Sequence, residues 1–159
     1  MEDLFRSDCV FISDKTTKEE IFAEVGSALL TKGWVTEDFA AHVIEREKNY
    51  PTGIDLEILQ RNLPNVGVPH TESMYVKTRM IVPIKLKQDV MFHNMIDPSK
   101  EMSVRFLFMI LNNDPEGQAN MLAAIMDFLT KSDAEALNKV FASEDKETIY
   151  TFLTNNFQS

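Results

Sequence analysis

The chain has 159 residues, of which 44% are hydrophobic and 26% are charged, and its formal net charge is -9 at pH 7. This size and composition predict a single globular domain over residues 1–159 with a core of its own. The negative charge argues against a nucleic-acid binder, because contacts to phosphates require a basic face. No apolar run approaches the roughly 18 residues that a membrane helix needs, so we expect a protein that is not embedded in a membrane.

The single cysteine, Cys9, excludes an internal disulfide and a metal site built from several thiolates. It lies in the segment Leu4–Ile12, whose weak alternation predicts a lead-in segment or an edge strand. The acidic opening of the chain, with no apolar segment behind it, is not typical of a secretory signal. These features favour the cytoplasm as the location.

Two helices are predicted before residue 50. Overlapping capping boxes begin at Thr16 and Thr17, ahead of apolar residues at helical spacing, and Gly33 suits a helix end that needs a positive φ. Thr36 is predicted to cap the second helix, which ends in the charged run Glu45–Lys48. Taken alone, this run indicates a solvated helix end.

The middle of the chain has the patterns of strands. Ile54–Leu63 predicts a strand and a loop, and Tyr75–Leu86 predicts a half-buried strand whose basic residues face solvent. Pro83 indicates an edge or bulge position within it. Val90–His93 predicts a further short strand, and the nearly continuous apolar run Ser103–Leu111 predicts a strand buried on both faces.

Three helices are predicted after the buried strand. Pro115 suits the first turn of one helix, Ser132 begins a capping box for a short helix, and Ser143 is expected to cap the last one. The alternation of strand and helix patterns predicts an α/β fold, a three-layer sandwich in which a mixed β-sheet carries helices on both faces.

A candidate nucleophile follows the short apolar run Asn65–Val68. Pro69 cannot continue a strand, so His70 is expected at the end of a strand, where sites gather in such sheets. Gly67 has no Cβ and would let a ligand or a neighbouring backbone approach closely. A neutral imidazole has one free nitrogen near pH 7, although a merely hydrogen-bonded histidine is the simpler interpretation. The sequence contains no phosphate-cradling glycine loop, no serine nucleophile elbow and no zinc-protease motif.

The segments Val66-Gly67-Val68-Pro69-His70, Glu45-Arg46-Glu47 and Tyr50-Pro51-Thr52-Gly53-Ile54 together carry a resemblance. In this order and spacing they resemble the IIA component of the bacterial phosphoenolpyruvate-dependent sugar phosphotransferase system, in its mannitol–fructose class. The resemblance spans nearly the whole chain and is strongest to the galactitol-type branch.

The resemblance implies a phosphotransferase with a phosphohistidine intermediate. His70 would accept a phosphoryl group from the phosphocarrier protein HPr and pass it to a cysteine of a separate IIB protein. A membrane IIC protein would then take up galactitol or a related sugar or sugar alcohol. This chemistry consists mainly of positioning and charge stabilisation, so we expect no cofactor and no metal.

The resemblance also implies three phosphate-binding residues. Arg46 matches the active-site arginine of the family, and its planar fork would hold two phosphoryl oxygens. Thr71 would add its hydroxyl or its backbone N–H. Gln118 matches the position of a second histidine in mannitol-like members. It can donate an amide hydrogen bond but cannot transfer a proton, and a surface glutamine in a first helical turn is the alternative.

Two other functions are compatible with the sequence. One is a free-standing regulatory module whose phosphorylation state is read by a partner protein. The other is a structural protein in which His70 has no chemical role. The identity of the sugar does not follow from the sequence, because a IIA protein contacts HPr and IIB and never the sugar.

Overall fold

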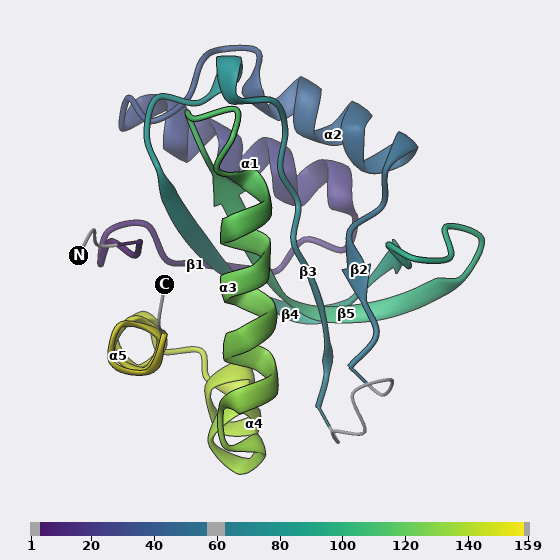
Figure 1. The fold of residues 1–159 in the computed structure, drawn as a ribbon, viewed down its shortest axis with the longest axis vertical. Helices are drawn as coiled ribbons and strands as arrows, with labels where there is room; N and C mark the ends of the chain where they lie inside the picture. Colours follow the sequence, from purple (N-terminus) through teal and green to yellow (C-terminus); the bar gives the residue numbers. More distant parts are fainter. Residues whose placement is uncertain (1–3, 57–62, 158–159) are drawn as a thin grey trace.

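A mixed five-stranded sheet forms the middle layer of the molecule, with the strand order β1-β4-β5-β3-β2 (Figure 1). The structure is a computed structural model that describes residues 4–56 and 63–157. The strands are β1 (Phe11–Ser13), β2 (Gly53–Ile54), β3 (Asn65–Gly67), β4 (Met80–His93) and β5 (Glu101–Leu111). β1 pairs in parallel with β4, and β3 pairs in parallel with β5, whereas the β4–β5 and β2–β3 pairs are antiparallel.

Helices cover both faces of this sheet, which confirms the predicted three-layer α/β fold (Figure 1). One face packs against α1 (Lys18–Thr31) and α2 (Phe39–Asn49). The other packs against α3 (Gln118–Lys131), α4 (Ala134–Ala142) and α5 (Lys146–Asn156). A short 3-10 helix, η1 (Ser73–Tyr75), precedes β4. No helix in the described part of the chain is long and apolar enough to cross a membrane.

A hydrophobic core lies on each face of the sheet, and β5 contributes side chains to both, as its apolar run predicts. Phe106, Phe108 and Ile110 are buried on the side of α3, α4 and α5. Leu107 and Met109 alternate with them and are buried on the side of α1 and α2. A strand covered on both faces needs apolar side chains at every position, because successive side chains point to opposite faces.

β4 differs from its prediction in four ways. It begins at Met80 rather than Tyr75, and Val90–His93 continues it instead of forming a separate strand. The pairing with β5 shifts register between Lys85 and Val90, so the polar residues in between form an irregularity rather than a break. Lys85 was predicted to face solvent but is only 4% exposed. Pro83 precedes the segment that β1 pairs with, and β4 is not an edge strand.

The first helix begins as predicted and the second does not. Thr17 caps α1 by accepting a hydrogen bond from the Glu20 backbone N–H, and Gly33 has a φ of 83° beyond its end. Thr36 is not the cap of α2, which begins at Phe39 after Asp38. The Thr36 carbonyl accepts a hydrogen bond from the Phe39 N–H at 3.2 Å, so a turn precedes the helix.

The later helices begin at other residues than predicted. Pro115 lies in a turn before α3, whose first residue is Gln118. Asp133 and Asp145, rather than Ser132 and Ser143, cap α4 and α5, because each aspartate side chain accepts a backbone N–H of the first turn.

Two strand predictions near the sheet edges are confirmed only in part. The predicted edge strand at Leu4–Ile12 is reduced to β1, at one edge of the sheet. β2 covers only the start of the predicted strand and loop at Ile54–Leu63, and residues 57–62 of that prediction lie outside the described residues.

Candidate functional site

The sheet topology brings two distant segments together. β3 and β5 are parallel neighbours, so their carboxyl ends lie at the same edge of the sheet, where open α/β sheets bind ligands. The Pro69 carbonyl accepts a hydrogen bond from the Ile110 N–H at 3.0 Å, and this bond connects the segment after β3 to the end of β5. His70 follows β3, and the turn before α3 follows β5.

A cavity of about 220 Å³ lies at this edge, and we call it the polar cavity. It contains all four residues that the sequence predicts for the site. Its lining residues are Arg46, His70, Thr71, Glu72, Ser73, Asp114, Pro115 and Gln118.

The ring of His70 is held in one orientation by the backbone. Its Nδ1 lies 2.8 Å from the Val68 carbonyl oxygen. Because a carbonyl oxygen can only accept, Nδ1 must carry the hydrogen, and Nε2 of the neutral ring is left with a free lone pair. The arrangement therefore leaves Nε2 as the ring nitrogen that could act as a nucleophile.

The surroundings of His70 favour the neutral ring. Burial lowers the pKa of His70 below its usual value, and the nearby Arg46 guanidinium lowers it further. The hydrogen bond to Val68 and the carboxylate of Glu72 act in the opposite direction without reversing the shift. A lowered pKa keeps the Nε2 lone pair available at neutral pH.

Arg46 reaches the polar cavity from the last turn of α2. Its Nη1 lies 3.3 Å from Oε1 of Glu72, and its guanidinium lies 5.1 Å from the centre of the Tyr50 ring. Its Nε is buried without a hydrogen-bond partner. An unpaired buried donor on a cation is costly, and an anion in the cavity would satisfy it.

Gln118 is the first residue of α3, as predicted for a first helical turn. Its Nε2 is also buried without a hydrogen-bond partner. The N-cap of α3 is Gly117, which has no side chain to satisfy the first backbone N–H groups. The positive end of the α3 dipole therefore lies next to the polar cavity, and it favours a negatively charged ligand.

Thr71 and Glu72 are coupled to each other. The Thr71 hydroxyl donates a hydrogen bond to Oε2 of Glu72 at 2.6 Å, and this bond is the main cause of the lowered pKa of Glu72. The Thr71 hydroxyl is therefore already engaged in this structure. Nothing in the sequence pattern distinguishes Glu72 from an ordinary surface glutamate, so it was not among the predicted site residues.

Glu47 is a second residue that the sequence analysis missed. Although it belongs to the predicted solvated run, it is 3% exposed. Its carboxylate accepts hydrogen bonds from the backbone N–H and the hydroxyl of Thr52, at 2.7 and 2.8 Å. The Thr52 carbonyl in turn accepts a hydrogen bond from the N–H of Val68, the same residue whose carbonyl orients His70.

The spacing of α2 contained a signal for Glu47. Phe39 and Val43 are buried at four-residue intervals, and Glu47 occupies the next position on the same face. Burial raises the pKa of Glu47 to about 7, although the hydrogen bonds from Thr52 oppose this. A glutamate in line with a buried stripe and followed by a turn is a candidate for such an anchor.

Gly67 has a different role from the one expected. It does not line the polar cavity, and a Cβ there would come within 2.8 Å of the Leu107 side chain and 3.1 Å of Phe92. The absence of a side chain therefore serves packing between β3 and its neighbours rather than the approach of a ligand.

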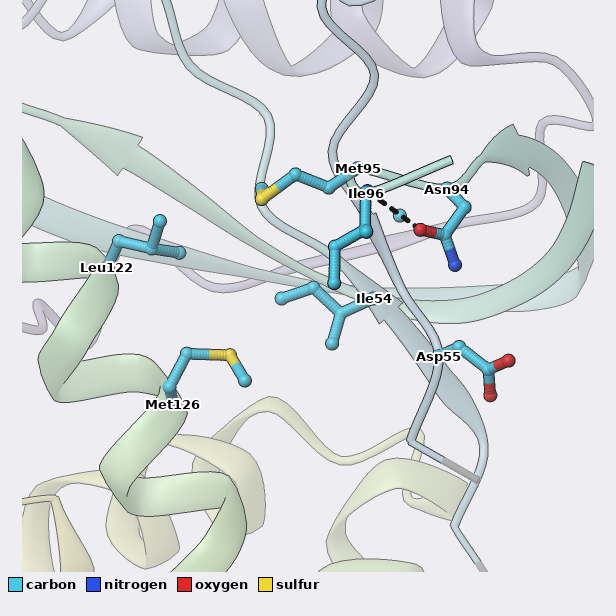
Figure 2. Close-up of a pocket in the computed structure, with 8 residues that line it drawn as sticks. Ile54, Asp55, Asn94, Met95, Ile96, Leu122 and Met126 are labelled. Carbon is cyan, nitrogen blue, oxygen red and sulfur yellow. Dashed lines mark hydrogen bonds between the residues drawn. The ribbon is translucent and has the colours of Figure 1, made fainter. Parts of the chain in front are cut away.

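A second cavity, of about 190 Å³, lies further along α3, and we call it the apolar cavity. Figure 2 shows the side chains of Ile54, Met95, Ile96, Leu122 and Met126 converging on it from β2, the β4–β5 loop and α3. Its other lining residues are Gly53, Asp55 and Asn94, and the Asn94 Oδ1 accepts a hydrogen bond from the Ile96 N–H. It contains no candidate nucleophile, so the polar cavity is the candidate site.

Comparisons with known proteins show which family the chain resembles. A family model described as "Phosphoenolpyruvate-dependent sugar phosphotransferase system, EIIA 2" matches residues 3–156. The galactitol-specific EIIA component of the phosphotransferase system of Escherichia coli K12 is 26% identical over 134 residues, which are 84% of this chain and 83% of that protein.

Two solved structures from Escherichia coli share the fold. The crystal structure of IIA mannitol has a TM-score of 0.72 at 18% identity, over 94% of this chain and 98% of that chain. A complex of enzyme IIA and phosphorylated enzyme IIB for mannitol has a TM-score of 0.73 at 17% identity, over 95% of this chain and 97% of the matched chain.

Proposed function

The chain belongs to the EIIA 2 family of the phosphoenolpyruvate-dependent sugar phosphotransferase system, and from this premise we propose that Nε2 of His70 carries the phosphoryl group. In this proposal residues 1–159 form one IIA domain in the cytoplasm. It accepts the group from phosphorylated HPr and passes it to a cysteine of a separate IIB protein.

One observation carries the proposal. The Val68 carbonyl fixes the tautomer of His70, and the same cavity is lined by Arg46 and Gln118, each of which has a buried donor without a partner. A phosphoryl group on Nε2 would place three oxygen acceptors in the cavity that these two residues line. A structural histidine would not require a cavity with unpaired donors beside it.

The transfer step needs no proton movement at His70. The Nε2 lone pair attacks phosphorus, and the N–P bond of the donor phosphohistidine breaks with its electron pair returning to the donor nitrogen. The Nδ1–H bond to Val68 persists and shares the positive charge that develops on the ring. Onward transfer reverses the roles, because a thiolate attacks phosphorus and the electron pair returns to Nε2.

The roles of the surrounding residues follow from their donors. Arg46 offers a cation and several N–H groups to the phosphoryl oxygens, and Gln118 offers its amide. Thr71 contributes its backbone N–H, or its hydroxyl once the bond to Glu72 is released. Among the described residues that line the polar cavity, His70 is the only histidine. The mechanism proposed here therefore uses one titrating nucleophile.

The proposal also includes the partner proteins and the transported sugar. The resemblance to a galactitol-specific EIIA component supports galactitol or a related sugar alcohol as the transported substrate. The fold shared with a IIA protein in complex with phosphorylated IIB supports a IIB acceptor for this chain. The membrane IIC protein would act only through IIB.

Intact-protein mass after incubation with phosphoenolpyruvate, enzyme I and HPr tests the proposal. Wild-type protein should gain one phosphoryl group that is labile to acid and stable to base, and His70→Ala should gain none. His93→Ala is the matched control, because His93 lies in β4 outside the polar cavity, and it should be labelled like wild type. An unlabelled wild type beside a labelled control IIA protein would refute the proposal and leave a binding or structural role.

A further inference from the structure

Glu72 occupies two of the groups that the proposed function assigns to the phosphoryl group. Its Oε1 lies 3.3 Å from Nη1 of Arg46, and its Oε2 accepts the Thr71 hydroxyl at 2.6 Å. The residue lines the same cavity as His70. In the unphosphorylated protein, a carboxylate thus sits where phosphoryl oxygens would be bound.

A carboxylate and a phosphoryl group compete for one guanidinium. Both present oxygen pairs that match the planar fork of arginine. The Glu72 side chain is 55% exposed, whereas Arg46 is 32% exposed, so the carboxylate is the partner that can turn into solvent. If it stayed, two anions would face each other across a small cavity, which is unfavourable.

We propose that Glu72 is a positioning residue that holds Arg46 in the unphosphorylated state and competes with the phosphoryl group for it. This inference rests on the proposed function of His70. Its consequence is a less stable phosphorylated state, so the group is passed on more readily to the acceptor.

The cycle has two exchanges of partner at Arg46. When the bond between Nε2 and phosphorus forms, Arg46 leaves Glu72 for the phosphoryl oxygens, and the carboxylate turns outward. When the acceptor thiolate takes the phosphoryl group, the N–P bond breaks and its electron pair returns to Nε2. Arg46 then pairs with Glu72 again, and this return contributes to the driving force of onward transfer.

The test measures the equilibrium between phosphorylated HPr and this protein, by intact mass of both after mixing. Glu72→Gln keeps the size of the side chain and an acceptor for Thr71 but removes the charge. We expect about a threefold rise in the equilibrium constant toward the phosphorylated protein, since exposed ion pairs are worth little more. Glu135→Gln in α4 removes the same charge outside the cavity and should leave the constant unchanged.

Two further variants separate competition from other causes. Glu72→Ala should raise the equilibrium constant toward the phosphorylated protein as Glu72→Gln does. A rise with Glu72→Gln alone would mean that the new amide binds the phosphoryl group. That result would overturn the inference. In an Arg46→Gln background, Glu72→Gln should have no further effect. A persisting effect would show direct repulsion rather than competition for Arg46, and would also overturn it.

The outcomes distinguish the two proposals. Labelled wild type with unchanged constants in both Glu72 variants overturns the role of Glu72 and leaves the proposed function standing. Wild type that accepts no phosphoryl group from HPr overturns both. Circular dichroism of each variant checks that the half-exposed position tolerates the change.

Discussion

The polar cavity and the apolar cavity both lie along α3 and differ in what their walls can bind. The polar cavity is lined by an oriented histidine and by Arg46 and Gln118, each of which has a buried donor without a partner. The apolar cavity, beside Leu122 and Met126, is lined mainly by aliphatic and thioether side chains (Figure 2). Both have similar volumes, about 220 and 190 Å³, so size does not separate them. The chemistry of their walls separates them, because of these two cavities only the polar cavity has a candidate nucleophile next to residues with unpaired donors.

The two cavities share a support. Glu47 anchors the Thr52 turn, which leads through Val68 to His70 on one side. Gly53, the next residue after Thr52, lines the apolar cavity on the other side. A change at Glu47 should therefore affect the stability around both cavities, whereas changes at the other residues should affect one.

The largest expected effect is on stability, from Glu47→Gln. The pKa of Glu47 is raised from 4.5 to about 7 in the folded protein, so the folded state binds the proton more tightly than the unfolded state. The stabilisation from this group is complete below about pH 4.5 and is lost as the pH rises through 7, by about 3 kcal/mol in all. Urea unfolding at several pH values should show this fall in wild type and not in Glu47→Gln. Equal pH dependence in both proteins would contradict it.

The next effect is on the polar cavity alone, from Arg46→Gln. Losing the cation should lower the rate of phosphorylation by HPr about 100-fold, as expected for a donor to developing charge. Arg46→Lys should retain part of the rate, because it keeps the charge but loses the planar fork. Rapid-quench measurement of phosphorylated protein gives these rates.

Lys48→Gln is the control for Arg46→Gln, since Lys48 is exposed in the same helix and lies outside the polar cavity. It should leave the rate within about twofold of wild type, because an exposed charge that does not line the cavity is largely screened. A similar loss of rate in both variants would indicate general charge steering of HPr rather than a contact by Arg46.

The smallest expected effects come from two substitutions in α3, one at each cavity. Gln118→Leu should lower phosphorylation about tenfold, since one hydrogen bond to a charged group is lost. It should not lower stability, because the replaced donor is buried without a partner. Leu122→Ala, one turn along α3, should lower stability by about 1 kcal/mol and leave phosphorylation unchanged.

Thermal unfolding and the HPr assay on the same two samples check this pair. The prediction fails if Gln118→Leu destabilises the fold without loss of rate. In that case Gln118 would be a surface glutamine with a structural role, and the polar cavity would depend on Arg46 and His70 alone.

Much of the fold follows from local patterns in the sequence. The alternation of patterns predicts the helices on both faces of a mixed sheet, and the apolar run predicts β5. Many of the errors are at the ends of elements, where neighbouring residues compete to begin or end a helix or strand. Thr36 and Asp38 are both reasonable caps for α2, and the turn that the Thr36 carbonyl makes with Phe39 selects the later one.

The site could be predicted only in part. Pro69 places His70 behind a strand end, and the resemblance identifies Arg46, Thr71 and Gln118 as its neighbours. The structure brings all four to one cavity, while their roles stay proposals. Glu72 escaped prediction because its ion pair with Arg46 joins segments that are distant in the sequence. Glu47 was missed although the four-residue spacing of α2 contained a signal, because a charged residue in a charged run indicates solvent.

The sequence by itself determined the family, the kinds of elements and the position of His70 after a strand, because these depend on motifs, periodicity and the backbone limits of proline. Only the tertiary structure decided that β3 lies beside β5, which brings His70 to the start of α3. It also decided which nitrogen of His70 is free and which carboxylate holds Arg46. These features depend on pairing between strands and on hydrogen bonds across the fold, which no local pattern records.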